Sequence, residues 1–223
     1  MPMALAEPPA PNDPPPRKLP RDARRLQLIE ATIEVMAGAG YARTTLTEVA
    51  RRAGLSHGLV NFHFQSKERL LAETLLYLAE EYRQNWTEAL EGAGPSAPEQ
   101  LHALMRADFN PRICTPARLS AWCSFWGEAQ GRPFYQELCG AKDAEYNLVL
   151  EALCARMNAE HGYAAHPQRA ARILRVTSEG MWLDMMTMTS PYAVDEATAT
   201  VMTAAAAFFP RHFDAGGLIV GQR

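Results

Sequence analysis

Residues 51–67 of this chain read RRAGLSHGLVNFHFQSK, and this stretch decides the fold. A short apolar helix pattern ends here, because Gly54 supplies a left-handed stop. Ser56 then stands where a helix N-cap is expected, and Ser66 can cap a further helix that starts at Lys67. A short helix held between two caps, after a glycine-containing turn, has the spacing of a helix-turn-helix, whose second helix enters the DNA major groove.

The short helix is expected to have an inward and an outward side. Leu59, Val60 and Phe62 are predicted to anchor it to its neighbours, which leaves outside Ser56, His57, Gly58, Asn61 and His63. Gly58 costs a helix about 1 kcal/mol against Ala, but it allows close approach to a groove. Histidines are also typical of surface and cap positions, and it is the motif that favours a role at DNA.

Helical patterns continue on both sides of this motif. Upstream, apolar residues recur at three- and four-residue steps from Leu26 to Met36, and GAG at 38–40 ends that helix. Thr45 and Glu48 then have the spacing of a capping box. No alternating strand pattern occurs, and further helices are predicted over residues 67–90, 98–109, 116–130, 133–160, 167–189 and 194–209. The predicted fold is therefore all-α, with a three-helix head joined to a helical body.

Charge is divided unevenly along the chain. The net charge is −3, but the segment from Arg17 to Arg69 has ten basic and five acidic residues, which leaves −8 for the remainder. This asymmetry suggests a polyanionic partner at the head, and a solvated charged surface is the alternative. No apolar run approaches the roughly 18 residues of a membrane span, and no secretory signal is visible, so we expect no membrane association and a cytoplasmic protein.

The cysteines and histidines do not indicate catalysis. Cys114, Cys123, Cys139 and Cys154 never have C-x-x-C spacing, so we interpret them as reduced, mostly buried thiols, with a redox pair or a metal site as the alternatives. No nucleophile, acid–base pair or metal spacing emerges. We therefore predict no catalytic residue, no metal and no cofactor; an all-α enzyme and an adaptor with a vestigial helix-turn-helix are the rival classes.

The stretch TTLTEVARRAGLSHGLVNFHFQSKERLL resembles the N-terminal domain of TetR-family transcriptional repressors. The resemblance covers residues 21–78 and includes the ARRAG turn and the F-x-x-K-x-x-L pattern that begins the fourth helix. It implies a repressor that binds double-stranded DNA and is cytoplasmic, or nucleoid-associated when bound. Many members carry a phosphate-contacting tyrosine where this chain has Asn61, so Phe62 or His63 would have to replace that contact.

Two segments of the body, LSAWCSFWGEAQGRPFYQELC and EGMWLDMMTM, look like the ligand domain of BetI-type repressors, which govern choline-to-betaine genes. This resemblance implies release from DNA by choline or a related quaternary ammonium compound. It also implies a homodimer built from the last two helices, with a palindromic operator; small residues there are Gly180, Ala199, Ala204 and Ala205. A repressor that senses a different hydrophobic or cationic molecule is the alternative.

These inferences divide the chain into four parts. We expect a disordered proline-rich tail over residues 1–20, a helix-turn-helix DNA-binding domain over 21–66, a ligand-binding and dimerisation domain over 67–213, and a flexible tail over 214–223.

The DNA site is predicted to use two kinds of contact. Helix starts, with Thr44, Thr45, Arg52 and Lys67, would hold phosphates and set position. Base reading would fall to Ser56, His57, Gly58 and Asn61, at about 1 to 3 kcal/mol of discrimination per good contact. Phe62 and His63 complete the predicted DNA-binding set.

Aromatic residues mark the predicted ligand site. Trp122 and Trp126 are four residues apart, and ring faces of this kind bind quaternary ammonium groups at about 0.5 to 2 kcal/mol each. Ordinary core packing is the alternative. The predicted ligand residues are Phe109, Trp122, Phe125, Trp126, Tyr146, Trp182 and Asp184, and the candidates for an anionic partner are Asp108, Glu128, Glu145, Glu179 and Asp184.

Overall fold

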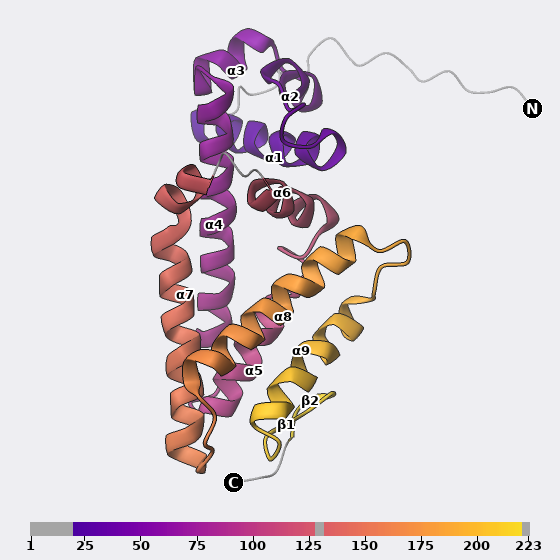
Figure 1. Cartoon of the computed structure of the whole chain (residues 1–223). Coiled ribbons are helices and arrows are strands. Elements are labelled where there is room, and N and C mark those ends of the chain that lie inside the picture. The colour runs from indigo at the N-terminus through magenta and orange to yellow at the C-terminus, as the bar shows by residue number, and fades with distance from the viewer. Residues whose placement is uncertain (1–19, 128–131, 220–223) are drawn as a thin grey trace, which may run out of the picture.

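The computed structural model describes residues 20–127 and 132–219, which are almost entirely helical (Figure 1). A head of three helices lies at one end of an elongated body, and α4 runs from the head along the body. Helix α6 packs against α1, between the head and the rest of the body. The helices are α1 (Arg21–Ala39), α2 (Leu46–Ala53), α3 (His57–Phe64), α4 (Lys67–Glu91), α5 (Ala97–Ala107), α6 (Pro116–Gly127), α7 (Arg132–His161), α8 (Pro167–Thr187) and α9 (Val194–Phe208).

The predicted caps delimit the helices of the head. The Ser56 hydroxyl accepts from the Leu59 amide at 3.3 Å, and the Ser66 hydroxyl accepts from the Arg69 amide at 3.2 Å. Gly54 ends α2 with φ 67°, the left-handed conformation that favours glycine. Thr45 also accepts from the Glu48 amide, but the Glu48 carboxylate pairs with Arg51, so the capping box is only half formed.

The body encloses its core between long helices. Helices α4, α5 and α7 pack together, while α8 joins α7 to α9 (Figure 1). Helix boundaries agree with the sequence predictions to within two residues, except that the predicted end of the 116–130 helix lies outside the described residues. None of the described helices is long and apolar enough to cross a bilayer.

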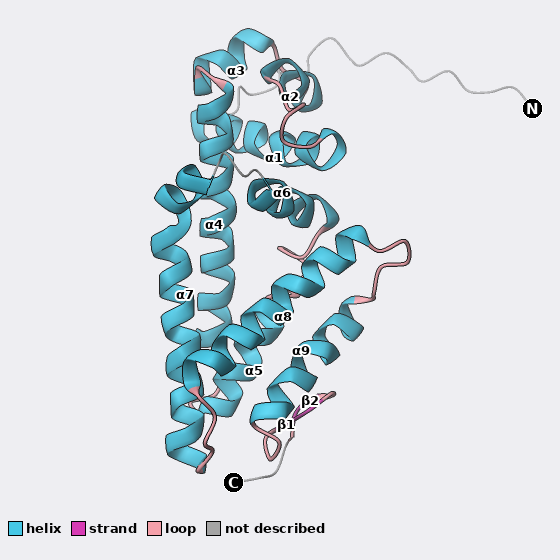
Figure 2. Cartoon of the chain, in the orientation of Figure 1, coloured by secondary structure: helices cyan, strands magenta, loops and turns pink. Residues whose placement is uncertain are grey.

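The C-terminal segment differs from its prediction. The sequence predicts no strand and a flexible tail from residue 214, but β1 (Phe213–Asp214) pairs with β2 (Gly217–Leu218) in an antiparallel hairpin beside α9 (Figure 2). Phe213 is buried, and a Cβ on Gly217 would lie 2.8 Å from His102 Nε2. The hairpin is therefore packed against α5, and residues 214–219 are part of the folded body instead of a separate tail.

Candidate nucleic-acid interface and ligand pocket

Most of the residues predicted to read bases lie on the exposed side of α3. Ser56, His57, Gly58 and Asn61 are all exposed, and the Thr47 hydroxyl lies 3.3 Å from His57 Nδ1. This contact joins α2 to the start of α3. A Cβ on Gly58 would meet no atom within 4 Å, so packing does not demand glycine there. The head thus presents a continuous polar surface at the N-terminal end of α3.

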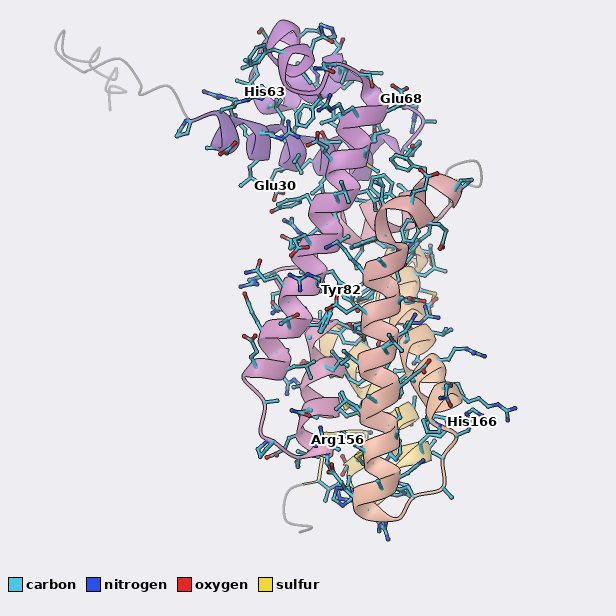
Figure 3. The ribbon with its side chains drawn as sticks, turned by 90° about the vertical axis from the view of Figure 1, so that its left-hand side faces the viewer. Glu30, His63, Glu68, Tyr82, Arg156 and His166 are labelled. Carbon is cyan, nitrogen blue, oxygen red and sulfur yellow. The ribbon has the colours of Figure 1, made fainter. Side chains whose placement is uncertain are left out.

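Two residues of α3 face opposite to their predicted directions. Phe62 is 67 % exposed, whereas His63 is only 6 % exposed and lies inside the head (Figure 3). Val60 and Phe64 anchor the helix, with the Arg25 guanidinium 4.9 Å from the centre of the Phe64 ring. Burial lowers the pKa of His63, as do the nearby arginines of α1, and both favour the neutral ring. The predictions that Phe62 anchors α3 and that His63 faces outward are wrong.

Several predicted phosphate-binding side chains are engaged inside the protein. Thr44 is fully buried and donates to the Gly40 carbonyl at 3.0 Å, so its hydroxyl does not face a groove. Lys67 Nζ donates to the carbonyls of Tyr41 and Ala42 at 3.2 and 2.9 Å and ties the start of α4 to the turn before α2. Arg52 is exposed and pairs with Glu34. Thr45 is exposed and caps α2.

A pocket of about 320 Å³ lies in the body, between α4, α6, α7 and α8. Four of the predicted ligand residues line it: Trp122, Trp126, Tyr146 and Trp182. The Trp126 ring stacks on the other two indoles, with centroid distances of 5.9 Å to Trp122 and 6.3 Å to Trp182. Trp126 is 39 % exposed, whereas the other three are buried, so it lies at the edge of an aromatic enclosure.

The sequence analysis missed three rings of this pocket, one of which is Tyr135 of α7, whose hydroxyl accepts from Trp126 Nε1 at 3.4 Å. Tyr82 and Trp86 of α4 line the same cavity, and Figure 3 shows Tyr82 between α4 and α7. The Tyr82 ring lies edge-on to Trp122 and Trp182, with centroids 6.5 and 5.8 Å apart. The sequence signal available for Tyr82 and Trp86 is their spacing of four residues, but this spacing fits the apolar face of α4 equally well.

Three other predicted ligand residues do not line the pocket. Phe109 is buried in the core, and Phe125 packs edge-on against Tyr41 with centroids 5.8 Å apart. Asp184 is half-buried outside the pocket. The structure therefore does not bring these three residues to the cavity. Of the candidate anionic partners, Asp108 and Glu179 line it, Glu145 does not, and Glu128 lies outside the described residues.

Asp108 is the buried carboxyl group of the pocket. It is 1 % exposed; the Tyr82 hydroxyl donates to its Oδ1 at 2.8 Å, and Trp182 Nε1 donates to its backbone carbonyl at 2.9 Å. Burial raises the pKa of Asp108 to about 7, although the hydroxyls of Ser178 and Tyr82 oppose the shift. Glu179 differs, because it pairs with Arg175 at 2.7 Å.

An ion-pair network links the pocket helix α6 to the head. Arg118 of α6 donates to both carboxylate oxygens of Glu81 on α4, at 2.7 and 2.8 Å, and to Glu30 of α1 at 2.9 Å. The Tyr77 hydroxyl donates to the same Glu30 oxygen at 3.0 Å. Because Arg118 is on the helix that carries Trp122 and Trp126, one helix touches both the pocket and the head.

The cysteines are unpaired thiols, as expected. Cys114, Cys139 and Cys154 are buried, and burial raises the pKa of their thiols to about 11, 12 and 12. A thiol with a raised pKa is a poor nucleophile at neutral pH. Within residues 20–127 and 132–219, no cluster of three or more His, Cys, Asp or Glu side chains could hold a metal ion.

Comparison with known families agrees with this geometry. Residues 28–74 match the N-terminal model of bacterial regulatory proteins of the tetR family, and residues 97–210 match the model described as "BetI-type transcriptional repressor, C-terminal". The chain belongs to the TetR family of transcriptional regulators, with a BetI-type C-terminal domain. It is therefore a DNA-binding regulator and not an enzyme, as the sequence indicated.

Curated relatives carry the same description. The HTH-type transcriptional regulator BetI of Paraburkholderia xenovorans is 30 % identical over 163 residues, covering 73 % of this chain and 82 % of the relative. The BetI protein of Burkholderia thailandensis is 31 % identical over 169 residues, with the same coverage.

Solved structures share the fold. A transcriptional regulator of Pseudomonas aeruginosa PAO1 has a TM-score of 0.71 and 25 % identity, covering 86 % of this chain and 93 % of the other. A transcriptional regulator of Saccharomonospora viridis in complex with choline also has a TM-score of 0.71, at 18 % identity, covering 86 % of this chain and 98 % of the other.

Proposed function

We propose that this regulator is a dimeric repressor that binds a palindromic operator and is released by choline or a related quaternary ammonium compound. The observation that carries the proposal is the pocket, in which aromatic rings from α4, α6, α7 and α8 surround a space beside a buried carboxyl group. A quaternary ammonium cannot donate hydrogen bonds, and ring faces attract its charge. A neighbouring carboxylate adds charge complementarity.

In this proposal the DNA contacts come from the exposed side of the head. Ser56, His57, Gly58 and Asn61 would read bases, and exposed Phe62 would lie beside them. Thr45 and Arg52, with the amides at the starts of α3 and α4, would contact phosphates. Lys67 would hold the loop that presents these groups, because its ammonium already binds two carbonyls.

Exposed apolar residues support dimerisation through α8 and α9. Ile173, Val176 and Leu183 of α8 are each 45–51 % exposed, and a Cβ on Gly180 between them would meet no atom within 4 Å. This spacing places them along one side of the helix. A second copy would cover the stripe, with Gly180 allowing close approach. Ala205, predicted for this surface, is buried within the subunit instead.

The proposed ligand can be tested with the protein's own tryptophans. Choline should quench tryptophan fluorescence and raise the melting temperature, because a ligand bound only to the folded state stabilises it. The neutral isostere 3,3-dimethyl-1-butanol has carbon in place of the charged nitrogen and should bind far more weakly. Equal affinities would contradict a cation site.

A matched pair of substitutions separates ligand binding from packing. Trp126→Leu keeps apolar bulk at a partly exposed site but removes the ring, so it should weaken choline binding far more than it lowers stability. Phe125→Leu is the control, because Phe125 is buried outside the pocket and should mainly affect stability. If Trp126→Leu lowers only stability, the aromatic rings are core and the proposed ligand is wrong.

A different small molecule remains the second candidate effector, and the charges of the pocket support one particular kind. Arg83, Lys142 and Arg175 also line the cavity, and an anionic group on the ligand could share them with Glu80 and Glu179, which already pair with them. A zwitterion such as betaine combines such a group with a quaternary ammonium. Parallel titrations with choline and betaine distinguish the two ligands.

A further inference from the structure

Three buried polar atoms of the pocket lie outside normal hydrogen-bond geometry with every described residue, although the Ser178 and Tyr146 hydroxyls face the Asp108 carboxyl and favour its charged form. They are Asp108 Oδ2, the Tyr146 hydroxyl and Ser178 Oγ, and all three residues line the same cavity. Buried polar atoms are normally paired, because leaving one unpaired costs about 1 to 3 kcal/mol. Three such atoms beside one cavity indicate a place built for a polar or charged group of the ligand.

The protein holds the Asp108 carboxyl in place but leaves one oxygen available. Tyr82 donates to Oδ1, and Trp182 holds the backbone carbonyl of the same residue. Oδ2 is thus the oxygen that either a proton or a ligand can occupy. The other two carboxylates of the pocket are less suitable, because Glu179 already pairs with Arg175 and Asp143 is exposed.

No cationic side chain of the described residues neutralises Asp108 directly. Tyr82 faces it from α4 and Tyr146 from α7, while Glu179 and Ser178 face it from α8 and Cys114 from the segment after α5. Among these groups, the nearest full charge is the carboxylate of Glu179, which makes ionisation of Asp108 harder. Arg175 balances Glu179 through their ion pair, and α6 contributes indole rings.

We propose that Asp108 is the counter-ion of the effector's cationic group, and that the cation and a proton compete for its carboxyl. Below about pH 7, the carboxyl of the empty pocket keeps its proton and is neutral. A bound cation beside Oδ2 favours the carboxylate, so the proton leaves for solvent when the effector enters. This inference rests on the proposed function, since it requires a cationic effector, and it adds a proton to the binding equilibrium.

The direction of the pH dependence follows from this competition. Burial sets the pKa of the empty site near 7. Above that pH the carboxylate is already present, and choline affinity should be constant. Below it, binding must displace a proton, so affinity should fall by up to about tenfold per pH unit, or roughly 20-fold between pH 7.5 and 5.5.

The experiment is a calorimetric titration of the full chain with choline at pH 5.5, 6.5, 7.5 and 8.5. Repeating it at pH 5.5 in buffers with different ionisation enthalpies should show close to one proton released per choline, and at pH 8.5 close to none. The neutral isostere 3,3-dimethyl-1-butanol should bind with no loss at low pH. Choline binding that is strong but independent of pH, with no proton released, would overturn the inference and leave the proposed function standing.

Asp108→Asn identifies the residue responsible. The amide keeps the shape of the side chain but cannot ionise, so choline affinity should be weak and flat with pH, while the neutral isostere should bind as well as before. Asp184→Asn is the matched control, because Asp184 lies outside the pocket, and it should keep the wild-type pH profile. If Asp108→Asn keeps the wild-type dependence of choline affinity on pH, the titrating group is a different residue and the proposed role of Asp108 is wrong. Failure of wild-type protein to bind choline or betaine at pH 8.5 would instead contradict the proposed function.

Discussion

Asp108 is a carboxylic acid enclosed by aromatic rings, so its ionisation costs the folded protein free energy. The folded, effector-free state keeps the proton to about pH 7, whereas the unfolded chain releases it near pH 4. Between these values the folded state binds more protons, so its stability falls as the pH rises. Asp108→Asn removes this loss, and from pH 5 to pH 8 it should gain about 2 to 3 kcal/mol of stability relative to wild type. Thermal unfolding without effector measures the gain. If the stabilities of the two proteins change with pH in the same way, folding does not raise the pKa of Asp108.

Two phenylalanines of α3, two residues apart, should behave in opposite ways. Phe64 is fully buried, so Phe64→Ala should cost about 3 to 5 kcal/mol of stability. Phe62 is exposed, so Phe62→Ala should change stability by less than about 0.5 kcal/mol. If Phe62 lies beside the operator, its loss should still weaken DNA binding. Thermal unfolding and gel shifts give the two readouts, and a large stability loss for Phe62→Ala would contradict the structure.

At the scale of the helix, α6 is expected to couple the pocket to the head. Arg118→Gln shortens the side chain and removes its charge, which leaves Glu30 and Glu81 without their shared partner. The substitution should have only a small effect on operator affinity and on choline affinity when each is measured alone. Its larger effect should be on the factor by which choline weakens operator binding, since that factor is the coupling between the sites. Gel shifts with and without choline measure it.

Arg112→Gln is the control for this coupling. Arg112 lies beside the network, in the surface hollow that Arg118 also lines, but its exposed ion pair is with Glu88 and not with Glu30 or Glu81. Arg112→Gln should leave unchanged the factor by which choline weakens operator binding. An Arg118→Gln protein that responds to choline like wild type would show that the signal travels by another route.

Local signals in the sequence predicted the helices well, because caps and apolar periodicity act within a few residues. Ser56 caps the start of α3, and Ser66 caps the start of α4 directly after it. Phe62 and His63 of α3 were assigned to the wrong sides, because a helix of two turns has few apolar positions to define a face. Its orientation depends on contacts with Arg25, far away in the sequence. The hairpin after α9 was missed because two-residue strands contain no detectable alternation.

The pocket could be predicted only in part. Its indole rings were visible in the sequence, but Tyr82 and Trp86 were indistinguishable from an ordinary apolar helix face. The choice of Asp108 among five carboxylates depends on burial, which only the packing of four helices decides. Asp184 was plausible beside Trp182 in the sequence, yet it lies outside the pocket.

At the scale of the whole molecule, dimerisation through α8 and α9 should be required for tight operator binding. Val176→Glu places a charge in the exposed apolar stripe and should produce monomers, because burying an unpaired charge is costly. Sedimentation gives the oligomeric state, and gel shifts should show weaker binding with a smaller salt dependence, since fewer phosphates are contacted.

Leu148→Glu is the matched control. Leu148 is 67 % exposed on α7 and is not part of the stripe on α8. This variant should remain a dimer. Dissociation by Leu148→Glu but not by Val176→Glu would move the interface to α7.

Contact with the head and most of the pocket wall come from different helices, and this separation bears on how such regulators acquire new inducers. Arg118 on α6 binds Glu30 of the head, whereas Tyr146 on α7 and Ser178 on α8 line the cavity without contributing to that ion pair. After gene duplication, substitutions confined to the pocket residues of α7 and α8 would change which effector binds. The ion pairs that join α6 to the head would stay intact. A biosensor library built on this scaffold should therefore randomise those pocket residues and leave Arg118, Glu30 and Glu81 untouched.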